Sequence, residues 1–456
     1  MELAAESTSP SAQPTSGIAA AAAPPSGLWP VWQRILFRLF FVYLMLQLAP
    51  WNWLFVIPGA GYLLEYVQKG INWAVYAAND HLFHQYDKLV PLNGSGDTSF
   101  AWTQMWLYMT VALVACVVWS VVDWRRPDYR RLNYWLRLAL RFYIASAALS
   151  YGIIKIFALQ MLFPTTSQLA TPLGDLLPMR FSWLFIGYSV PYQVFSGVME
   201  TMAGLLLLHR RTVTAGLLAA AGAFMNVLMI NLSYDVPVKL YASHLLLACI
   251  YLLALDSLRL ANFLVLNRPT PATRAWDPFW TKPWQVWGGR LVWAVVTWNI
   301  LVTPFRNGYR RYKVTNAPPI AGPLKAGVYD VTSYVVNKAA MPFTAGDTLR
   351  WKDVIIDSHM AASVGTADEL FQRRYGRGYF RYKPDTATRM AAVWKTSTIP
   401  DDSTFLFNMR YEVLDTSTIR LHTVIRGDSI HVELVRKARH FQLAERQFHW
   451  LSEYNR

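Results

Sequence analysis

The most informative feature of the sequence is a set of long apolar runs in its first two thirds. A helix needs about 20 apolar residues to cross the hydrocarbon core of a bilayer. Runs of about this length lie near residues 33–57, 101–122, 139–162, 182–208, 212–232, 237–260 and 288–305. The pattern therefore predicts about seven transmembrane helices within residues 28–305, and Pro50 is expected to kink the first of them.

A different pattern begins at about residue 323, where apolar and polar residues alternate. Phe405 to Val413, Ile419 to Ile425 and Ile430 to Leu434 carry apolar side chains at every second position. This period is typical of β-strands that are buried on one face. Further strand candidates lie at 328–336, 348–356, 378–382 and 390–396. Residues 323–456 are therefore predicted to form a small antiparallel β domain, either a lipocalin-like barrel or a sandwich.

The rest of the chain connects or flanks these two parts. Residues 1–27 are rich in Ala, Ser, Pro and Thr and lack the basic start of a cleaved signal peptide, so we expect a disordered cytoplasmic tail. Residues 62–78 are amphipathic and are expected to lie on the outer membrane surface. Residues 306–322 are expected to be a linker. The predicted fold class is mainly α, with a polytopic helix bundle followed by the β domain.

Charge supports this division and gives an orientation. Only 16% of the residues are charged, compared with roughly a quarter in soluble domains. Basic residues gather in short clusters between the apolar runs, as at Arg125 to Arg137 and His209 to Arg211. Such clusters mark cytoplasmic loops and do not form the stripe of a nucleic-acid-binding surface. We therefore expect a cytoplasmic N-terminus, an extracytoplasmic β domain and no nucleic-acid partner.

Ionisable side chains inside the apolar runs are the candidates for function. Each costs about 2.5–3.5 kcal/mol on insertion scales, so each is expected to have a partner or a role. The candidate intramembrane site comprises Lys155, Ser196, Glu200, Asp235, Lys239 and His244. Tyr192, Ser196 and Glu200 follow one another at four-residue steps, which predicts a polar stripe on one helix.

Each of these residues has a structural and a functional interpretation. Glu200 either forms a hydrogen bond to a neighbouring helix or faces a lipophilic pocket and exchanges a proton. Lys155 is expected to pair with Asp235, with extension to the membrane surface and an anionic head group as alternatives. Asp235 also has the pattern of a helix N-cap. His244 is either a packing residue or the end of a proton path from Asp235 and Lys239.

Metal and cofactor chemistry has weaker support. Asp80, His81, His84 and Asp87 follow the first apolar run, and positions 80, 84 and 87 would share a helix face, so a metal or haem site is the alternative to a solvated loop. Cys116 and Cys249 are expected to be buried, inert thiols. No nucleotide, iron–sulfur or haem-attachment motif is present, so no cofactor is evident, although quinone is compatible with the apolar setting.

Three motifs resemble a known family. Ser150 to Lys155, Gly197 to Arg211 and Asn231 to Lys239 look like the DoxX/DoxD-like bacterial membrane proteins. The resemblance covers about residues 130–265 and implies a four-helix membrane core in the bacterial inner membrane. Longer members share Asn93 to Thr98 and an ending like Phe448 to Tyr454. Some relatives are subunits of quinone-linked sulfur oxidation or terminal oxidases, and others are assembly factors.

These observations lead to one hypothesis of function and two alternatives. The first is an accessory protein whose helical core binds quinone or membrane lipid at the intramembrane site, while the β domain contacts a periplasmic or membrane protein. The second is a subunit of a quinone-linked oxidoreductase, in which Glu200 or His244 exchanges protons with quinone. The third is a transporter, which would predict inverted repeats or broken helices.

Overall fold

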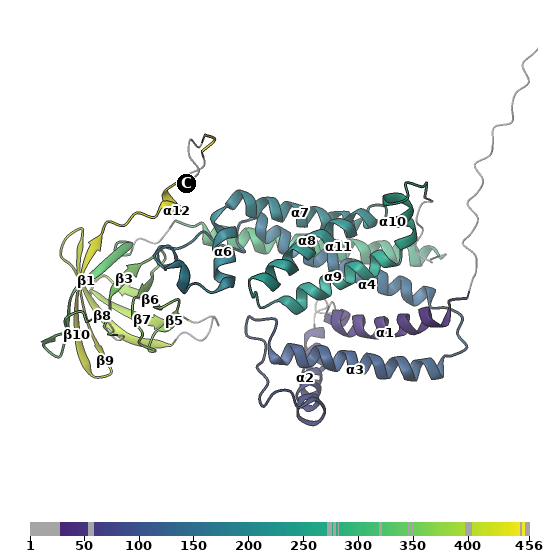
Figure 1. Ribbon diagram of the computed structural model, residues 1–456, viewed down its shortest axis with the longest axis horizontal. Coiled ribbons are helices and arrows are strands. Elements are labelled where there is room, and N and C mark those ends of the chain that lie inside the picture. Colours follow the sequence, from purple (N-terminus) through teal and green to yellow (C-terminus); the bar gives the residue numbers. More distant parts are fainter. Residues whose placement is uncertain are drawn as a thin grey trace, which may run out of the picture.

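The computed structural model describes residues 28–52, 59–270, 276, 280, 282–318, 322–344, 347, 350–396, 404–446 and 449–451. A helical bundle and a β-barrel lie end to end along the long axis of the molecule (Figure 1). The expected N-terminal tail and most of the motif at 448–454 fall outside the described residues. The predicted class, apolar helices followed by an antiparallel β domain, is confirmed.

The bundle is built from helices that run along this axis. They are α1 (Val31–Leu48), α3 (Ser99–Val122), α4 (Arg130–Ile156), α7 (Val190–Leu208), α8 (Val213–Ser233), α9 (Lys239–Ala254) and α11 (Pro283–Thr315). Among the described residues, five helices are long and apolar enough to cross a membrane: α1 continued to Asn52, α3, α4, α8 and α11. A sixth span is possible if α9 and α10 (Ser257–Leu264), which are bent by 79° to each other, act as one.

Two predicted boundaries are wrong. The apolar run 182–208 is divided into α6 (Pro178–Tyr188) and α7, because Ser189 is extended and Pro191 occupies the first turn of the new helix. The predicted linker 306–322 is helical at its start, because α11 continues to Thr315 without a break at its internal Pro304. The basic residues after Phe305 therefore belong to a helix.

The amphipathic stretch forms α2 (Ala60–Ala78), which crosses the end of α3 in Figure 1. Its exposed apolar side chains include Tyr62, Leu63, Tyr66 and Trp73. It continues into a short π-helix, η2 (Asn79–Phe83). An exposed apolar helix face of this kind is suited to the interface between lipid and water.

Glycines bring α4 and α7 into close contact. A Cβ atom on Gly197 would lie 2.6 Å from the carbonyl oxygen of Gly152, and one on Gly152 would lie 2.8 Å from the carbonyl oxygen of Gly197. Gly204 approaches Leu149 in the same way, at 2.8 Å from its Cγ. Small residues at facing positions let two helix backbones approach, which is how membrane helices gain packing energy.

The C-terminal part is a closed barrel rather than a sandwich. Its strands are β1 (Gly327–Val336), β2 (Ala339–Ala340), β3 (Asp353–Ile356), β4 (Ala361–Val364), β5 (Gln372–Arg374), β6 (Arg377–Asp385), β7 (Met390–Lys395), β8 (Phe405–Val413), β9 (Thr418–Ile425) and β10 (Asp428–Lys437). The order is β10-β9-β8-β7-β6-β4-β3-β1, and β1 also pairs with β10. Closure removes the two free edges that an open sheet would expose. A short helix, α12 (Gln442–Glu445), follows.

The alternating residues fill the barrel interior as predicted. Phe407, Met409 and Tyr411 of β8 are buried, and Leu421 of β9 packs with them in one cluster. Trp351, Phe371, Phe380 and Tyr382 belong to the same cluster. The barrel thus has a packed aromatic core.

The segment between α4 and α7 attaches the bundle to the barrel. It contains α5 (Thr166–Leu169), η3 (Leu173–Asp175) and α6, and α5 lies against β3. Ser167 donates from its backbone nitrogen to Asp357 Oδ1 at 3.1 Å and from Oγ to Oδ2 at 2.5 Å. Arg180 donates to the hydroxyl of Tyr375 at 2.8 Å. All four side chains therefore help to fix the barrel at one end of the bundle.

Acidification is expected to strengthen this junction. Burial raises the pKa of Asp357, and the hydrogen bonds from Ser167 offset the increase only in part. The folded state therefore binds a proton more tightly than the unfolded state, so this contribution to the free energy of unfolding is largest below about pH 4 and is lost as pH rises through the raised pKa. Hydrogen exchange of residues 166–171 should slow on acidification, after correction for the intrinsic rate.

The variant Asp357→Asn is the control for this prediction. Its amide keeps an acceptor for the Ser167 backbone and places a donor beside the Ser167 hydroxyl, which can accept. The pH dependence of protection should disappear in this variant. Equal pH dependence in both proteins would contradict the assignment to Asp357.

Candidate functional site

The sharpest feature of the bundle is an ion pair between α4 and α7. Lys155 Nζ lies 2.5 Å from Glu200 Oε1, and the two side chains are only 7% and 3% exposed. The expected pair between Lys155 and Asp235 is therefore wrong. The glycine contacts bring Lys155 beside Glu200, whereas Asp235 is exposed in the turn after α8 and pairs with Lys239 at 2.6 Å.

The predicted polar stripe on α7 is also wrong. Tyr192 is exposed and Ser196 is half-buried, while Glu200 is buried. Four-residue steps rotate by roughly 40° each around a helix of 3.6 residues per turn, so the three positions drift apart. The buried line is Gln193, Gly197, Glu200 and Gly204.

Gln193 is a buried partner that the sequence reasoning missed. Its Nε2 donates to the carbonyl of Met161 at 2.7 Å, and its Oε1 accepts from the Met161 backbone nitrogen at 3.1 Å. Further along the helix, Glu200 Oε2 and Thr201 Oγ1 are buried without a hydrogen-bond partner in the described part of the chain. The signal for Gln193 was its spacing of seven residues from Glu200, which places both on one helix face.

His244 is bonded at both ring nitrogens. Nδ1 lies 2.6 Å from the carbonyl of Leu240, and Nε2 lies 2.6 Å from the hydroxyl of Tyr43 on α1. Because a carbonyl only accepts, Nδ1 carries a proton and the neutral ring accepts from Tyr43 at Nε2. This arrangement favours the structural interpretation of His244, as a link between α9 and α1.

Asp97 holds the start of α9, a role that the sequence pattern assigned to Asp235. Asp97 Oδ2 accepts from the backbone nitrogen of Lys239 at 2.7 Å, and Oδ1 accepts from that of Leu240 at 2.9 Å. Asp235 has a φ of 50° and lies outside the helix. The cap comes from the Gly-rich loop before α3, so nothing near position 239 in the sequence could have revealed it.

The metal candidates do not converge. In the described residues no three His, Cys, Asp or Glu side chains lie close enough to hold an ion. Asp80, His81, His84 and Asp87 lose the expected shared face because the helix widens into η2 and His84 has a φ of 47°, which ends it. Cys116 and Cys249 are free and buried, as predicted.

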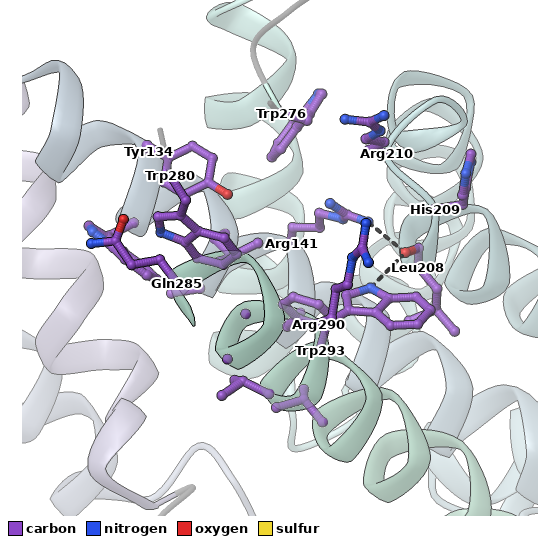
Figure 2. A pocket seen from close by; sticks show the side chains of 18 of the residues that line it. Tyr134, Arg141, Leu208, His209, Arg210, Trp276, Trp280, Gln285, Arg290 and Trp293 are labelled. Atoms are coloured by element: carbon purple, nitrogen blue, oxygen red, sulfur yellow. Dashed lines mark hydrogen bonds between the residues drawn. The ribbon is translucent and has the colours of Figure 1, made fainter. Parts of the chain in front are cut away.

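A large apolar cavity lies elsewhere in the described part of the chain, at the end of the bundle away from the barrel. It has a volume of about 730 Å³ and lies between the first turns of α4, the end of α7 and the start of α11 (Figure 2). Its lining includes the indole rings of Trp135, Trp276, Trp280, Trp284 and Trp293. We call it the tryptophan cavity. Its size and apolar walls are those of a site for a lipophilic small molecule.

Close contacts fix the walls of the tryptophan cavity. Trp280 lies against Gly289 so closely that a Cβ atom there would overlap the indole ring. The Nε1 atom of Trp293 donates to the carbonyl of Leu208 at 3.3 Å, which joins α11 to the end of α7. Gly288 also lines the cavity, and a Cβ atom there would meet nothing within 4 Å.

Arginines provide the charge in the tryptophan cavity. Arg141 is 4% exposed, and it donates from Nε to the carbonyl of Leu207 at 2.5 Å and from Nη2 to that of Leu208 at 2.7 Å. Arg210 and Arg290 line the same cavity (Figure 2). Its described lining contains no aspartate or glutamate. The cavity is therefore apolar with a positive end.

The sequence reasoning missed this cavity because its parts look ordinary in isolation. Arg141 follows a run of basic residues and reads as one more cytoplasmic charge, while the tryptophans read as anchors at the membrane interface. Only the folded arrangement shows that Arg141 points between helices. The available signal was the abundance of tryptophan from position 135 to position 293, where the five that line the cavity occur.

Comparison with known proteins gives little further information. The uncharacterized protein YwoB of Bacillus subtilis (strain 168) is 29% identical over 116 residues, which is 25% of this chain and 73% of that protein. No family model matches the chain. No solved structure matches it. The resemblance to the DoxX/DoxD-like proteins therefore stays a prediction.

Proposed function

We propose that this chain is a DoxX-like accessory protein of the bacterial inner membrane that binds a lipophile in the tryptophan cavity. The observation that carries the proposal is the cavity itself, about 730 Å³ between α4, α7 and α11 with five tryptophans in its lining. The proposal moves the ligand away from Lys155 and Glu200, because those two side chains bind each other and are almost fully buried.

The arrangement of charge supports an orientation for the protein. The basic segments before α4 and after α7 lie at the end of the bundle opposite the barrel (Figure 1). Basic loops face the cytoplasm in membrane proteins. In this proposal α7 and the bent pair of α9 and α10 join the five apolar helices to give seven spans. The N-terminus and the tryptophan cavity then face the cytoplasmic leaflet, and the barrel is extracytoplasmic.

The proposed lipophile is a membrane lipid or a quinone, and the barrel is free to contact a periplasmic or membrane protein. Native mass spectrometry of the detergent-purified full chain, followed by extraction, identifies which molecule remains bound. The variant Gly288→Trp should fill the cavity without a backbone clash, because the Cβ position is open. We expect it to reduce the bound lipophile at least severalfold.

Gly222→Trp on α8 is the matched control, since its Cβ position is also open and it does not line the tryptophan cavity. This variant should retain the lipophile at the wild-type level. The proposal fails if the wild-type chain carries no lipophile, or if Gly288→Trp retains as much as the control.

A further inference from the structure

We propose that the lipophile in the tryptophan cavity is an anionic phospholipid, with its phosphate against Arg141 and Arg290 and an acyl chain along the indole rings. This inference rests on the proposed function and names the chemical class of its ligand. It follows from the positive charge of the cavity lining, which contains no described carboxylate, whereas Lys155 elsewhere in the bundle is paired with Glu200.

Arg141 is a buried cation, and no carboxylate of the described residues pairs with it. In the described part of the chain its contacts are two carbonyl oxygens and the faces of Phe142 and Trp276. Burying a charge is costly unless an opposite charge compensates it. Lys155, the other buried cation of α4, meets this requirement through Glu200. No described carboxylate does the same for Arg141.

The end of α7 compensates Arg141 only in part. The carbonyls of Leu207 and Leu208 belong to the last turn of that helix, where the helix dipole is equivalent to roughly half a negative charge. Two of the five guanidinium donors are used by these carbonyls. A net positive charge and an Nη1 group without a described hydrogen bond therefore remain for a ligand.

Arg290 adds a second cation on the facing helix. It lines the cavity from α11, and its described contact is with the ring of Trp287 at 4.9 Å. A phosphate can accept from two guanidinium groups at once, because it presents several oxygens and matches their planar donors. Arg141 and Arg290 therefore present two cations from facing helices to an anionic head group.

The apolar part of the cavity selects a lipid over a free anion. Trp276, Trp280 and Trp284 line it together with Leu138 and Val292, so a small anion alone would leave this surface without a partner. A hydrocarbon chain can pack against these apolar side chains, whereas a hydrated anion cannot. In the proposed orientation the cavity lies at the level of the cytoplasmic leaflet, whose anionic lipids attract basic side chains.

The test uses the full chain in detergent with equal amounts of phosphatidylglycerol and phosphatidylcholine that carry the same acyl chains. Native mass spectrometry should show phosphatidylglycerol bound at least about tenfold more than phosphatidylcholine. Arg290→Gln should reduce that ratio severalfold, because it removes one cation. Arg311→Gln, an exposed arginine on the same helix outside the cavity, should leave the ratio unchanged.

A second variant separates charge recognition from folding. Arg141→Lys keeps the charge beside the end of α7 and removes the two-pronged donor, so it should retain the preference for phosphatidylglycerol in weakened form. Equal binding of both lipids to the wild-type chain, abolished by Gly288→Trp, would overturn the charge assignment and leave the proposed function standing. Displacement of the lipid by millimolar inorganic phosphate alone would overturn the assignment to a phospholipid.

Discussion

Glu200→Leu is expected to lower the free energy of unfolding by about 3–5 kcal/mol, because it leaves the ammonium group of Lys155 buried without its partner. The two side chains are almost fully enclosed between α4 and α7, so water cannot replace the lost carboxylate. Equilibrium unfolding in mixed micelles measures the change. The single variant Lys155→Met should be destabilised to a similar degree for the reciprocal reason.

The double variant Lys155→Met/Glu200→Leu distinguishes a lost pair from lost packing. Replacing a buried ion pair by apolar side chains of similar volume is often neutral or stabilising, so the double variant should lie within about 1 kcal/mol of the wild type or above it. It should also retain the lipophile, because the tryptophan cavity does not include either residue. If the double variant lost as much free energy of unfolding as the two single variants together, the two side chains would not be energetically coupled.

Gly197→Ala should have the second large effect. Its Cβ atom would lie 2.6 Å from the carbonyl oxygen of Gly152 and 2.7 Å from the backbone nitrogen of Ile156. Both atoms belong to the backbone of α4, so the helices must separate, and overpacking of this kind costs about 1–3 kcal/mol. Separation also lengthens the contact between Lys155 and Glu200. The midpoint of thermal unfolding in detergent should fall.

Gly222→Ala on α8 provides the comparison. Nothing lies within 4 Å of its Cβ position, and alanine is about 1 kcal/mol more favourable than glycine inside a helix. The same chemical change should therefore raise the unfolding midpoint here and lower it at Gly197. A Gly197→Ala protein as stable as Gly222→Ala would mean that α4 and α7 are not in close contact.

Much of the fold could be predicted because it depends on local pattern. The lengths of the apolar runs identify α1, α3, α8 and α11, and the alternation of Phe405 to Val413 identifies β8. Barrel and sandwich remained alternatives because the distinction depends on the pairing of β1 with β10, such as Tyr334 opposite Val432. Nothing in either strand alone encodes that contact.

The site was harder to predict because it depends on which helices are neighbours. The free-energy cost of placing a charged side chain in the membrane was enough to identify Lys155 and Glu200 as residues that need a partner. Their pairing depends on the close glycine contacts between α4 and α7, and a glycine in a sequence motif does not show which helix it faces. Arg141 was overlooked because a basic residue near a cytoplasmic loop is expected to be solvated, and only its position against Leu207 and Leu208 shows otherwise.

The junction at Ser167 and Asp357 limits how the barrel can move. The chain enters the barrel from α11. The segment between α4 and α7 makes a second attachment, through the contacts of Ser167 with Asp357. Because Arg180 also contacts Tyr375, the barrel is held at more than two separated points and cannot swing as a body on a single tether would. Anything that grips the barrel therefore exerts torque on the ends of α4 and α11, the two helices that also frame the cavity at the far end.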